Sequence, residues 1–161
     1  MAKKTKLKKT LVEQILNKAK IEHQGLQMNA LDDSLTEEFD RSQIYKTLAL
    51  NGDKTGTVIG ILPITEHLSE KKLAKISGNK KVSMIPQKDL EKTTGYIHGA
   101  NNPVGIRQKH NYPIYIDETA LELEKMIVSA GEVGHSIVIS PKDLANFVKA
   151  SFVDILEENN S

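Results

Sequence analysis

A single lysine lies within an otherwise apolar stretch of the sequence. Lys46 falls inside the run 44–50, whose composition is typical of a β-strand. Because strand side chains alternate between two faces, Lys46 shares its face with Leu48. If that face is buried, the ammonium needs a partner or a ligand, and it could hold an anion or stabilise charge developing on a carbonyl. Equally, Tyr45 and Thr47 could point inward and leave Lys46 on an exposed face.

A glycine-rich stretch over residues 93–105 is a second candidate for chemistry. Small residues let backbone amides approach a ligand and donate hydrogen bonds to a phosphate or an oxyanion. The alternative is an ordinary two-turn connection, although the stretch is long for one. Its central candidates are Gly99, Ala100, Asn101, Asn102, Pro103 and Gly105. A later apolar strand ends in the small residues Ser129, Ala130 and Gly131, which are well placed for a pocket wall.

Several familiar catalytic and metal-binding motifs are absent from the sequence. The run 53–55 lacks the glycines of a nucleotide phosphate-binding loop, and no serine lies in Gly-x-Ser-x-Gly. The chain has no cysteine, and none of its five histidines pairs at i, i+4 spacing with another ligand. We therefore expect no metal and no cofactor. His98 could serve as an acid or base, but a lone histidine is more often structural or exposed.

The composition is that of a globular protein, and we expect one domain over residues 1–161. No apolar run is long enough to span a membrane and no signal peptide is visible, so the expected location is cytoplasmic. The net charge is only +1, but residues 1–20 and 71–92 each carry seven lysines. These two basic segments could contact phosphates, or they could be ordinary solvated helix faces.

The periodicity and the turn residues predict the elements that must position these candidates. Helices are expected over 6–20, 70–77 and 86–92, at 118–123 as a turn or two, and from 141 onward. Strands are expected over 21–28, 44–50, 57–62, 81–85, 112–117, 126–130, 136–139 and 152–156.

Two segments break this alternation of helices and strands. Residues 30–41 are acidic and predict a loop or a short helical turn. Residues 93–113 carry three glycines and two prolines, which break any long element. Interleaved short strands and helices favour an α+β fold, with a mixed, β-barrel-like sheet and flanking helices.

Taken in order, the short motifs of this chain resemble the YbaK/EbsC family, the free-standing relatives of the editing domain inserted in bacterial prolyl-tRNA synthetases. The resemblance runs from about residue 11 to residue 155. It rests on these motifs: Tyr45-Lys46-Thr47-Leu48, Lys71-Lys72-Leu73-Ala74, Lys80-Lys81-Val82, Thr93-Thr94-Gly95-Tyr96, Gly99-x-x-x-Pro103-x-Gly105 and Val128-Ser129-Ala130-Gly131. Their order and spacing are more specific than any one of them, and the wider match favours the EbsC-like branch.

The resemblance implies an enzyme that removes a wrong amino acid from tRNA, typically cysteine from tRNA(Pro) and also from tRNA(Cys). It implies that Lys46 is the key residue, that the loop 99–105 supplies backbone donors around the aminoacyl ester, and that residues 129–131 line the amino-acid pocket. The expected partners are aminoacylated tRNA and, as a source of tRNA selectivity, prolyl-tRNA synthetase. Neither a metal nor sequence-specific DNA binding is implied.

The chain departs from the family pattern at three places near the implied pocket. Many members have Gly-Ile-Ser-Pro where this chain has the run 100–103, and a basic residue where it has Glu132-Val133. An aromatic residue common in the first strand corresponds to Met28. These departures leave amino-acid specificity open. They also keep open an EbsC-type regulatory or ligand-binding protein on the same fold, without catalysis.

Overall fold

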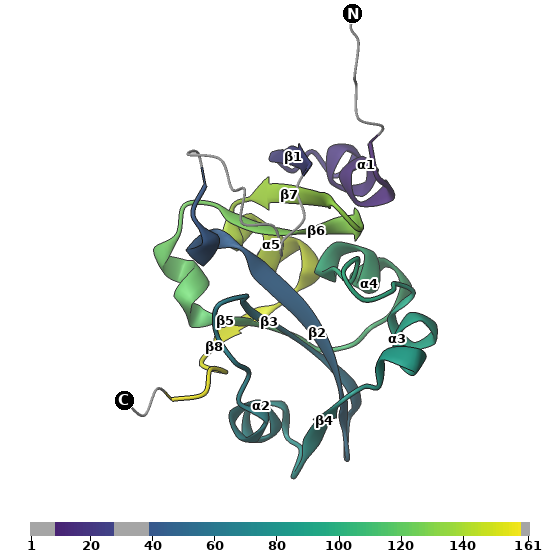
Figure 1. Ribbon diagram of the computed structural model, residues 1–161, viewed down its shortest axis with the longest axis vertical. Coiled ribbons are helices and arrows are strands. Elements are labelled where there is room, and N and C mark those ends of the chain that lie inside the picture. Colours follow the sequence, from purple (N-terminus) through teal and green to yellow (C-terminus); the bar gives the residue numbers. More distant parts are fainter. Residues whose placement is uncertain (1–8, 28–38, 159–161) are drawn as a thin grey trace, which may run out of the picture.

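The computed structural model describes residues 9–27 and 39–158, which form two β-sheets surrounded by helices (Figure 1). The smaller, antiparallel sheet has the strand order β1 (His23–Gln27), β7 (His135–Ile139), β6 (Met126–Glu132). The larger sheet has the order β4 (Val82–Met84), β2 (Tyr45–Gly52), β3 (Gly56–Pro63), β5 (Ile114–Asp117), β8 (Ser151–Val153). In it, β2 runs antiparallel to β3 and β4, whereas β3, β5 and β8 run parallel.

Five α-helices occur in the described residues, and local signals set their ends. They are α1 (Leu11–Lys18), α2 (Glu70–Ser77), α3 (Gln87–Thr94), α4 (Pro103–Lys109) and α5 (Pro141–Val148), with 3₁₀ turns at Arg41–Gln43 and Glu118–Glu122. A capping box of Thr10 and Glu13 starts α1, because each side chain bonds the other residue's backbone amide. Ser69 caps α2, and Gly78 ends it with φ of +84°, where a glycine carries no steric cost.

The main hydrophobic core unites both sheets with α1, α4 and α5. It draws on β2 and β3 in the larger sheet, for example Tyr45 and Ile61, and on β6 and β7 in the smaller one, for example Val128 and Ile137. Figure 1 shows the smaller sheet and α1 in the upper part of the molecule, with the larger sheet below them. The first residues of β2 therefore lie where the two sheets meet, beside Ile127 of β6.

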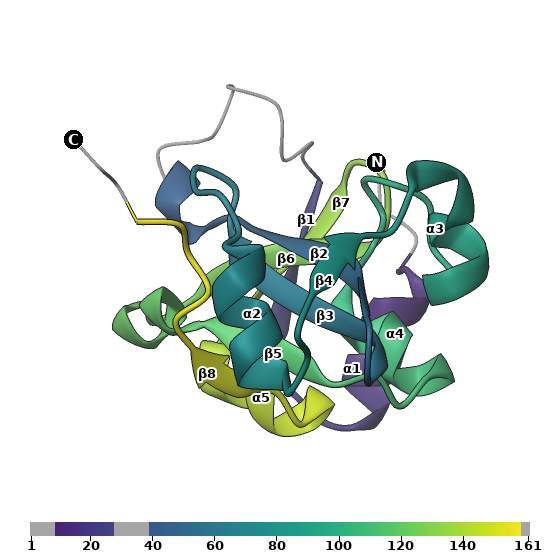
Figure 2. The same ribbon diagram turned by 90° about the horizontal axis from the view of Figure 1, so that it is seen from below.

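A second, smaller core covers the other face of the β2–β3 hairpin. Leu50, Val58, Leu73 and Ile155 are fully buried in it, so it joins the hairpin to α2 and to the C-terminal segment. Seen from below, α2 lies in front of the larger sheet (Figure 2). The two cores together explain why β2 has few exposed residues on either face.

Several predicted boundaries need correction. The first helix covers residues 11–18 of the expected 6–20, and residues 6–8 of that range lie outside the described residues. The expected loop 30–41 lies mostly outside the described residues, although its end begins a 3₁₀ turn capped by Asp40. The last strand ends at Val153, because the amide of Ile155 bonds a buried carboxylate rather than a neighbouring strand.

The helix α4 is an element that was not predicted within residues 93–113, where the glycines and prolines were expected to break any long element. Pro103 occupies its first turn and Asn102 caps it, accepting the amide of Gly105 at 2.6 Å. A proline at this position costs nothing, since the first helical amides have no partner within the helix. The sequence signal was present: an asparagine followed by proline marks a helix start, whereas Pro103 had been counted as a breaker. None of the described helices is both long and apolar enough to cross a membrane.

Candidate functional site

Lys46 lies on the face of β2 that is turned away from the main core. Tyr45 and Thr47 are buried on the opposite face, so the second of the two sequence interpretations is the correct one for the direction of the side chains. Lys46 is nevertheless half-buried, and its Nζ donates to the carbonyl oxygen of Glu66 at 3.0 Å. Burial lowers the pKa of the Lys46 ammonium, because desolvation disfavours its charged form.

The loop 95–102 that precedes α4 is exposed at residues 97–99 and buried at residues 100–102. Gly99 has φ of +90°, a conformation that favours glycine, and the amide of Ala100 bonds the carbonyl of Ile97. Asn102 is fully buried, where its Nδ2 donates to the carbonyl of Ala100 while its Oδ1 caps α4. The amide of Gly105 is thus committed to the helix cap and is not a free donor for a ligand.

The loop contacts β2 through Asn101. Its Nδ2 donates to the carbonyl oxygen of Thr47 at 3.1 Å, and Asn101 and Thr47 are only 7% and 8% exposed. Neither the Oδ1 of Asn101 nor the Oγ1 of Thr47 has a hydrogen-bond partner among the described residues. Buried polar atoms in proteins are almost always paired, so these two unpartnered oxygens set the junction of loop and strand apart from the rest of the described core.

The loop also contacts the end of β6. Gly131 lies in a β-bulge with φ of +93°, and its amide donates to the Oγ of Ser129 at 3.1 Å. A Cβ added at Gly131 would lie 3.4 Å from the Asn102 Nδ2 and 3.4 Å from the Tyr96 ring. A glycine at this position therefore allows the bulge and the loop to pack closely together.

The start of β2 lies against β6 and completes the cluster. Ile44 and Ile127 form a parallel bridge between the two sheets. The bridge is isolated, and it brings the start of β2, just before Lys46 in the chain, next to β6. Figure 1 shows β2 passing below β6 and beside α4. Three segments far apart in the sequence, namely β2, the loop 99–102 and the β6 bulge, thus meet in one place.

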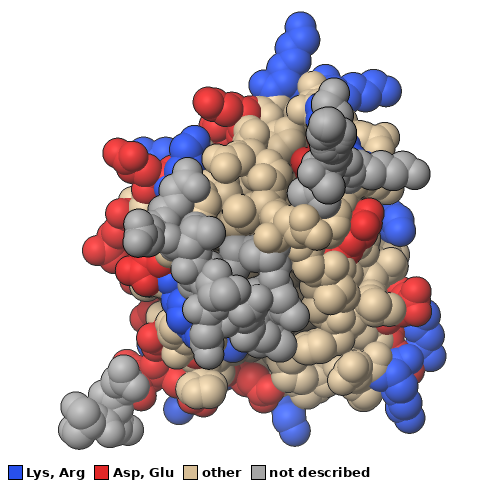
Figure 3. Space-filling view, turned by 45° about the horizontal axis from the view of Figure 1, so that its top comes forward, with Lys and Arg blue, Asp and Glu red and all other residues tan. Residues whose placement is uncertain are grey.

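The surroundings of this cluster are aromatic and basic on one side. Gly105 lies directly under the Tyr96 ring, so a side chain there would overlap the Tyr96 hydroxyl. The Nζ of Lys109 lies 4.9 Å from the centre of the same ring, a cation–π contact. Figure 3 shows a broad uncharged area on the side of the molecule that holds α1 and the smaller sheet, with charged side chains at its rim.

The structure brings together most of the residues singled out from the sequence. The candidates Lys46, Ala100, Asn101, Asn102, Pro103, Ser129, Ala130 and Gly131 belong to these three segments or border them, and Gly99 is the exposed start of the loop. Met28 lies outside the described residues. No group of three or more metal-ligating side chains is found in the described parts of the chain.

Three groups of the site escaped sequence reasoning as functional candidates. The Thr47 hydroxyl was considered only as a possible core contact, Tyr96 only as part of a motif, and the Glu66 carbonyl not at all. The alternation along β2 could have pointed to Thr47, because a hydroxyl on a core-facing strand position needs a partner. No local signal marks a backbone carbonyl twenty positions away as the partner of Lys46.

Comparison with known proteins places this geometry in a family. Residues 28–147, well over half of the chain, match the aminoacyl-tRNA editing domain family. The chain belongs to that family. Its class of substrate is therefore aminoacylated tRNA, and the resemblance to YbaK/EbsC proteins seen in the sequence is confirmed. Three of the motifs of this editing domain lie on β2, on the loop before α4 with the first turn of α4, and on the β6 bulge.

A curated relative covers almost the whole editing-domain chain. It is an Enterococcus faecalis protein named "Putative Cys-tRNA(Pro)/Cys-tRNA(Cys) deacylase EbsC". The two sequences are 36% identical over 162 residues, which is 96% of this chain and 98% of the relative. The relationship therefore extends beyond the residues matched to the family and includes α1.

Solved structures share the same fold. One, described as "a putative trans-editing enzyme for prolyl tRNA synthetase", has a TM-score of 0.78 at 21% identity and covers 91% of this chain and 95% of its own. Another, of a protein described only as hypothetical, has a TM-score of 0.81 at 20% identity and covers 91% and 99%. At these identities the likeness establishes the fold alone, and it confirms the α+β class, with the strands divided between two sheets.

Proposed function

We propose that this chain removes mischarged amino acids from tRNA in trans, with cysteine on tRNA(Pro) as the preferred substrate and cysteine on tRNA(Cys) as a further one. The observation that carries the proposal is the position of Lys46. In a chain of the editing family, β2 carries a half-buried lysine whose Nζ bonds the carbonyl of Glu66, and the next residue along β2, Thr47, is bonded by the loop 99–102. The relative named as a deacylase of these two tRNAs supports the choice of substrate.

In the proposed mechanism, the substrate brings most of the chemistry. An aminoacyl ester of tRNA is already activated, so oriented donors and one cation are sufficient for catalysis. Lys46 orients the terminal adenosine or its phosphate, while backbone amides of the loop stabilise the oxyanion that develops on the ester carbonyl. Gly105 is excluded from this role, because its amide caps α4.

For a cysteinyl substrate, we propose that the nucleophile is the substrate's own thiol. The sulfur bonds to the ester carbonyl carbon, the bond from that carbon to the ribose oxygen breaks, and the thiol proton ends on the ribose hydroxyl. The products are a thiolactone and free tRNA. In this route the protein need supply only orientation and charge. Attack by water is the alternative route, and the products distinguish the two.

The specificity for tRNA is proposed to come from outside this small domain. The net charge of +1 gives little long-range attraction for a polyanion, so we infer that prolyl-tRNA synthetase, working beside it in the cytoplasm, delivers the correct tRNA. Without the synthetase, the chain should then discriminate between amino acids better than between tRNAs.

The test is a deacylation panel with the wild type and Lys46→Ala. The substrates are cysteinyl-, alanyl- and prolyl-tRNA(Pro), and cysteinyl-tRNA(Cys). Fast loss of cysteine that depends on Lys46, with prolyl-tRNA(Pro) spared, would support the proposal, and thiolactone among the products would support the thiol route. If no substrate is cleared above its spontaneous rate, the chain is not a deacylase, and a regulatory or ligand-binding role takes its place.

A further inference from the structure

The ammonium of Lys46 is held by a connecting loop. Its hydrogen-bond partner among the described residues is the carbonyl oxygen of Glu66, in the loop 64–69 between β3 and α2. Loops are usually the most mobile parts of a fold, and a carbonyl can hold a cation in one place only if its own loop is fixed. Whatever fixes the loop 64–69 therefore also sets the position of Lys46.

The C-terminal segment 154–158 pairs with this loop through one antiparallel bridge. Two main-chain hydrogen bonds, from Ser69 N to Ile155 O at 2.8 Å and from Glu157 N to His67 O at 2.9 Å, together form this bridge between Leu68 and Leu156, which is called the ladder below. The paired residues begin directly after Glu66 and run to the N-cap of α2. The ladder thus restrains the part of the loop that carries the Lys46 partner.

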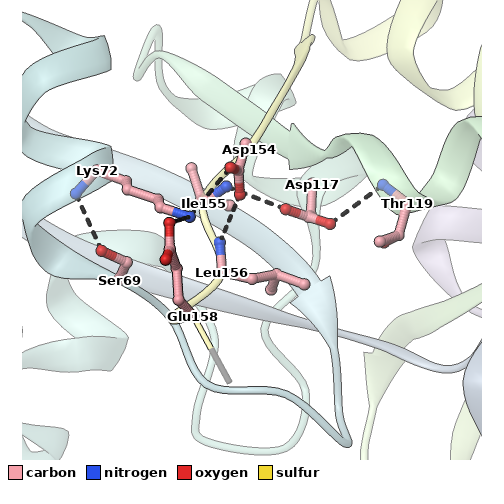
Figure 4. Close-up of polar contacts among 8 residues, drawn as sticks. All are labelled: Ser69, Lys72, Asp117, Thr119, Asp154, Ile155, Leu156 and Glu158. Atoms are coloured by element: carbon pink, nitrogen blue, oxygen red, sulfur yellow. Dashed lines mark hydrogen bonds and ion pairs between the residues drawn. The ribbon is translucent and has the colours of Figure 1, made fainter. Parts of the chain in front are cut away.

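A buried carboxylate anchors the C-terminal segment. Asp117, at the end of β5, is 1% exposed, and its Oδ1 accepts the amide of Ile155 at 3.0 Å while its Oδ2 accepts the amide of Thr119 at 3.1 Å (Figure 4). Ile155 itself is fully buried in the second core. The segment is therefore fixed both by a charge-assisted hydrogen bond and by a buried side chain.

Ion pairs tie the same segment to α2. The Nζ of Lys72 lies 3.0 Å from the Asp154 carboxylate and 3.8 Å from that of Glu158 (Figure 4). Lys72 belongs to the first turn of α2, and its amide bonds the side chain of Ser69, the cap that ends the loop. The C-terminal segment, the loop and α2 therefore form one connected unit.

We propose that the C-terminal segment 154–158 is a positioning element for Lys46, acting through its ladder with the loop 64–69 and the Glu66 carbonyl. This inference rests on the proposed function, in which Lys46 orients the tRNA end. Lysine has four rotatable side-chain bonds, so an ammonium without a fixed partner would spread over several positions. A misplaced group far from the chemistry can still slow a reaction strongly.

The test removes one hydrogen bond of the ladder. Glu157→Pro removes the amide that donates to His67 but leaves the side-chain contacts of the second core in place, and Glu157→Ala is the matched control that keeps the amide. Proline favours an extended residue before it, which suits the bridging Leu156. We expect Glu157→Pro to lower the single-turnover deacylation rate about tenfold, with tRNA affinity unchanged, and Glu157→Ala to behave as wild type.

A second readout does not depend on activity. The ¹³Cε resonance of Lys46, assigned by its loss in Lys46→Arg, reports the surroundings of the ammonium. We expect it to shift toward that of an exposed lysine in Glu157→Pro but not in Glu157→Ala. A slower reaction with an unchanged Lys46 resonance would overturn the proposal, and so would a shifted resonance with an unchanged rate.

The two proposals fail in different ways. If the wild-type chain does not deacylate any substrate, the proposed function fails, and the Lys46 resonance alone decides whether the segment positions Lys46.

If Glu157→Pro does not fold, Lys72→Gln takes its place, with the neighbouring exposed Lys71→Gln as control. Lys72→Gln should slow the reaction and shift the resonance in the same direction, and Lys72→Arg should restore both. Unchanged behaviour of Lys72→Gln would overturn the proposal.

Discussion

At the scale of single residues, the protonation of Lys46 depends on how far burial removes its ammonium from solvent. Burial lowers its pKa, while the Glu66 carbonyl holds it in place. Because the folded pKa lies below that of the unfolded chain, the unfolded state binds more protons between the two values. The free energy of unfolding must therefore rise as the pH rises through the folded pKa.

We predict that this rise in the free energy of unfolding with pH occurs in the wild type and is absent in Lys46→Met. Below the folded pKa, the buried charge opposes folding in the wild type alone, so Lys46→Met should be at least as stable as wild type at neutral pH. Urea unfolding of both proteins at several alkaline pH values measures the difference. A Lys46→Met protein that is much less stable at neutral pH would show that the lysine has a structural role instead.

The unpartnered hydroxyl of Thr47 gives a second prediction at this scale. Thr47→Val keeps the shape of the side chain and removes an oxygen that has no partner among the described residues. Stability should therefore stay the same or rise by about 1 kcal/mol. The control is Thr94→Val, because the fully buried Thr94 hydroxyl donates to Leu90 and accepts from Tyr96. Thermal unfolding should show a clear loss for Thr94→Val, and equal losses in both variants would contradict the prediction.

At the scale of elements, α4 carries a conflict between helix propensity and packing. Gly105 lies in a helix, where alanine is favoured over glycine by about 1 kcal/mol. The Cβ of an alanine there would overlap the Tyr96 ring, and overpacking typically costs about 1–3 kcal/mol. We predict that packing wins, so that Gly105→Ala is destabilised in chemical unfolding and loses deacylation activity.

A double variant and a control make the Gly105 prediction specific. Tyr96→Ala should remove the overlap, so Gly105→Ala should cost less in that background than in the wild type. Gly60→Ala is the control, because a Cβ there meets its nearest neighbours at 3.6 Å, an ordinary contact. If Gly105→Ala is more stable than wild type, the Tyr96 ring can move aside, and the gain in helix propensity exceeds the cost of overpacking.

How well the sequence predicted each element depended on local signals. The helix over 70–77 was predicted to the residue, because Ser69 and Gly78 mark its two ends. The helix after Asn102 was missed, since Pro103 and Gly105 are start signals or breakers depending on context. The face of Lys46 could not be chosen from spacing, because β2 is covered on both sides by separate cores.

The candidate site was predictable only in part. The motifs and their resemblance to a family gave the three segments, but nothing in the sequence gave the bond between Asn101 and Thr47 or the partner of Lys46. Those contacts depend on loops meeting across the fold. Local propensity carries no information about such long-range contacts.

At the scale of the whole molecule, the charge distribution limits how the chain can hold tRNA. The net charge is +1, and one face carries a broad uncharged area with charges at its rim (Figure 3). A polyanion would therefore meet few lysines near the site. Lys109, over the Tyr96 ring, is the exposed cation that the structure places beside the loop. Lys81 directly precedes β4 and lies beside the turn of the β2–β3 hairpin, where its amide donates to the Asp53 carboxylate.

We predict that tRNA binding depends only weakly on salt and that Lys109 supplies part of this dependence. Each phosphate contact contributes about one unit to the slope of log affinity against log salt, so Lys109→Gln should reduce the slope by about one. Lys81→Gln should leave it unchanged, because the hairpin turn lies roughly 20 Å along β2 from Lys46 at ~3.3 Å per residue. Titration of tRNA at several NaCl concentrations measures both slopes. Equal reductions for the two variants would mean that binding is diffuse over the surface, and then the site near Lys46 could not orient the end of the tRNA through local contacts alone.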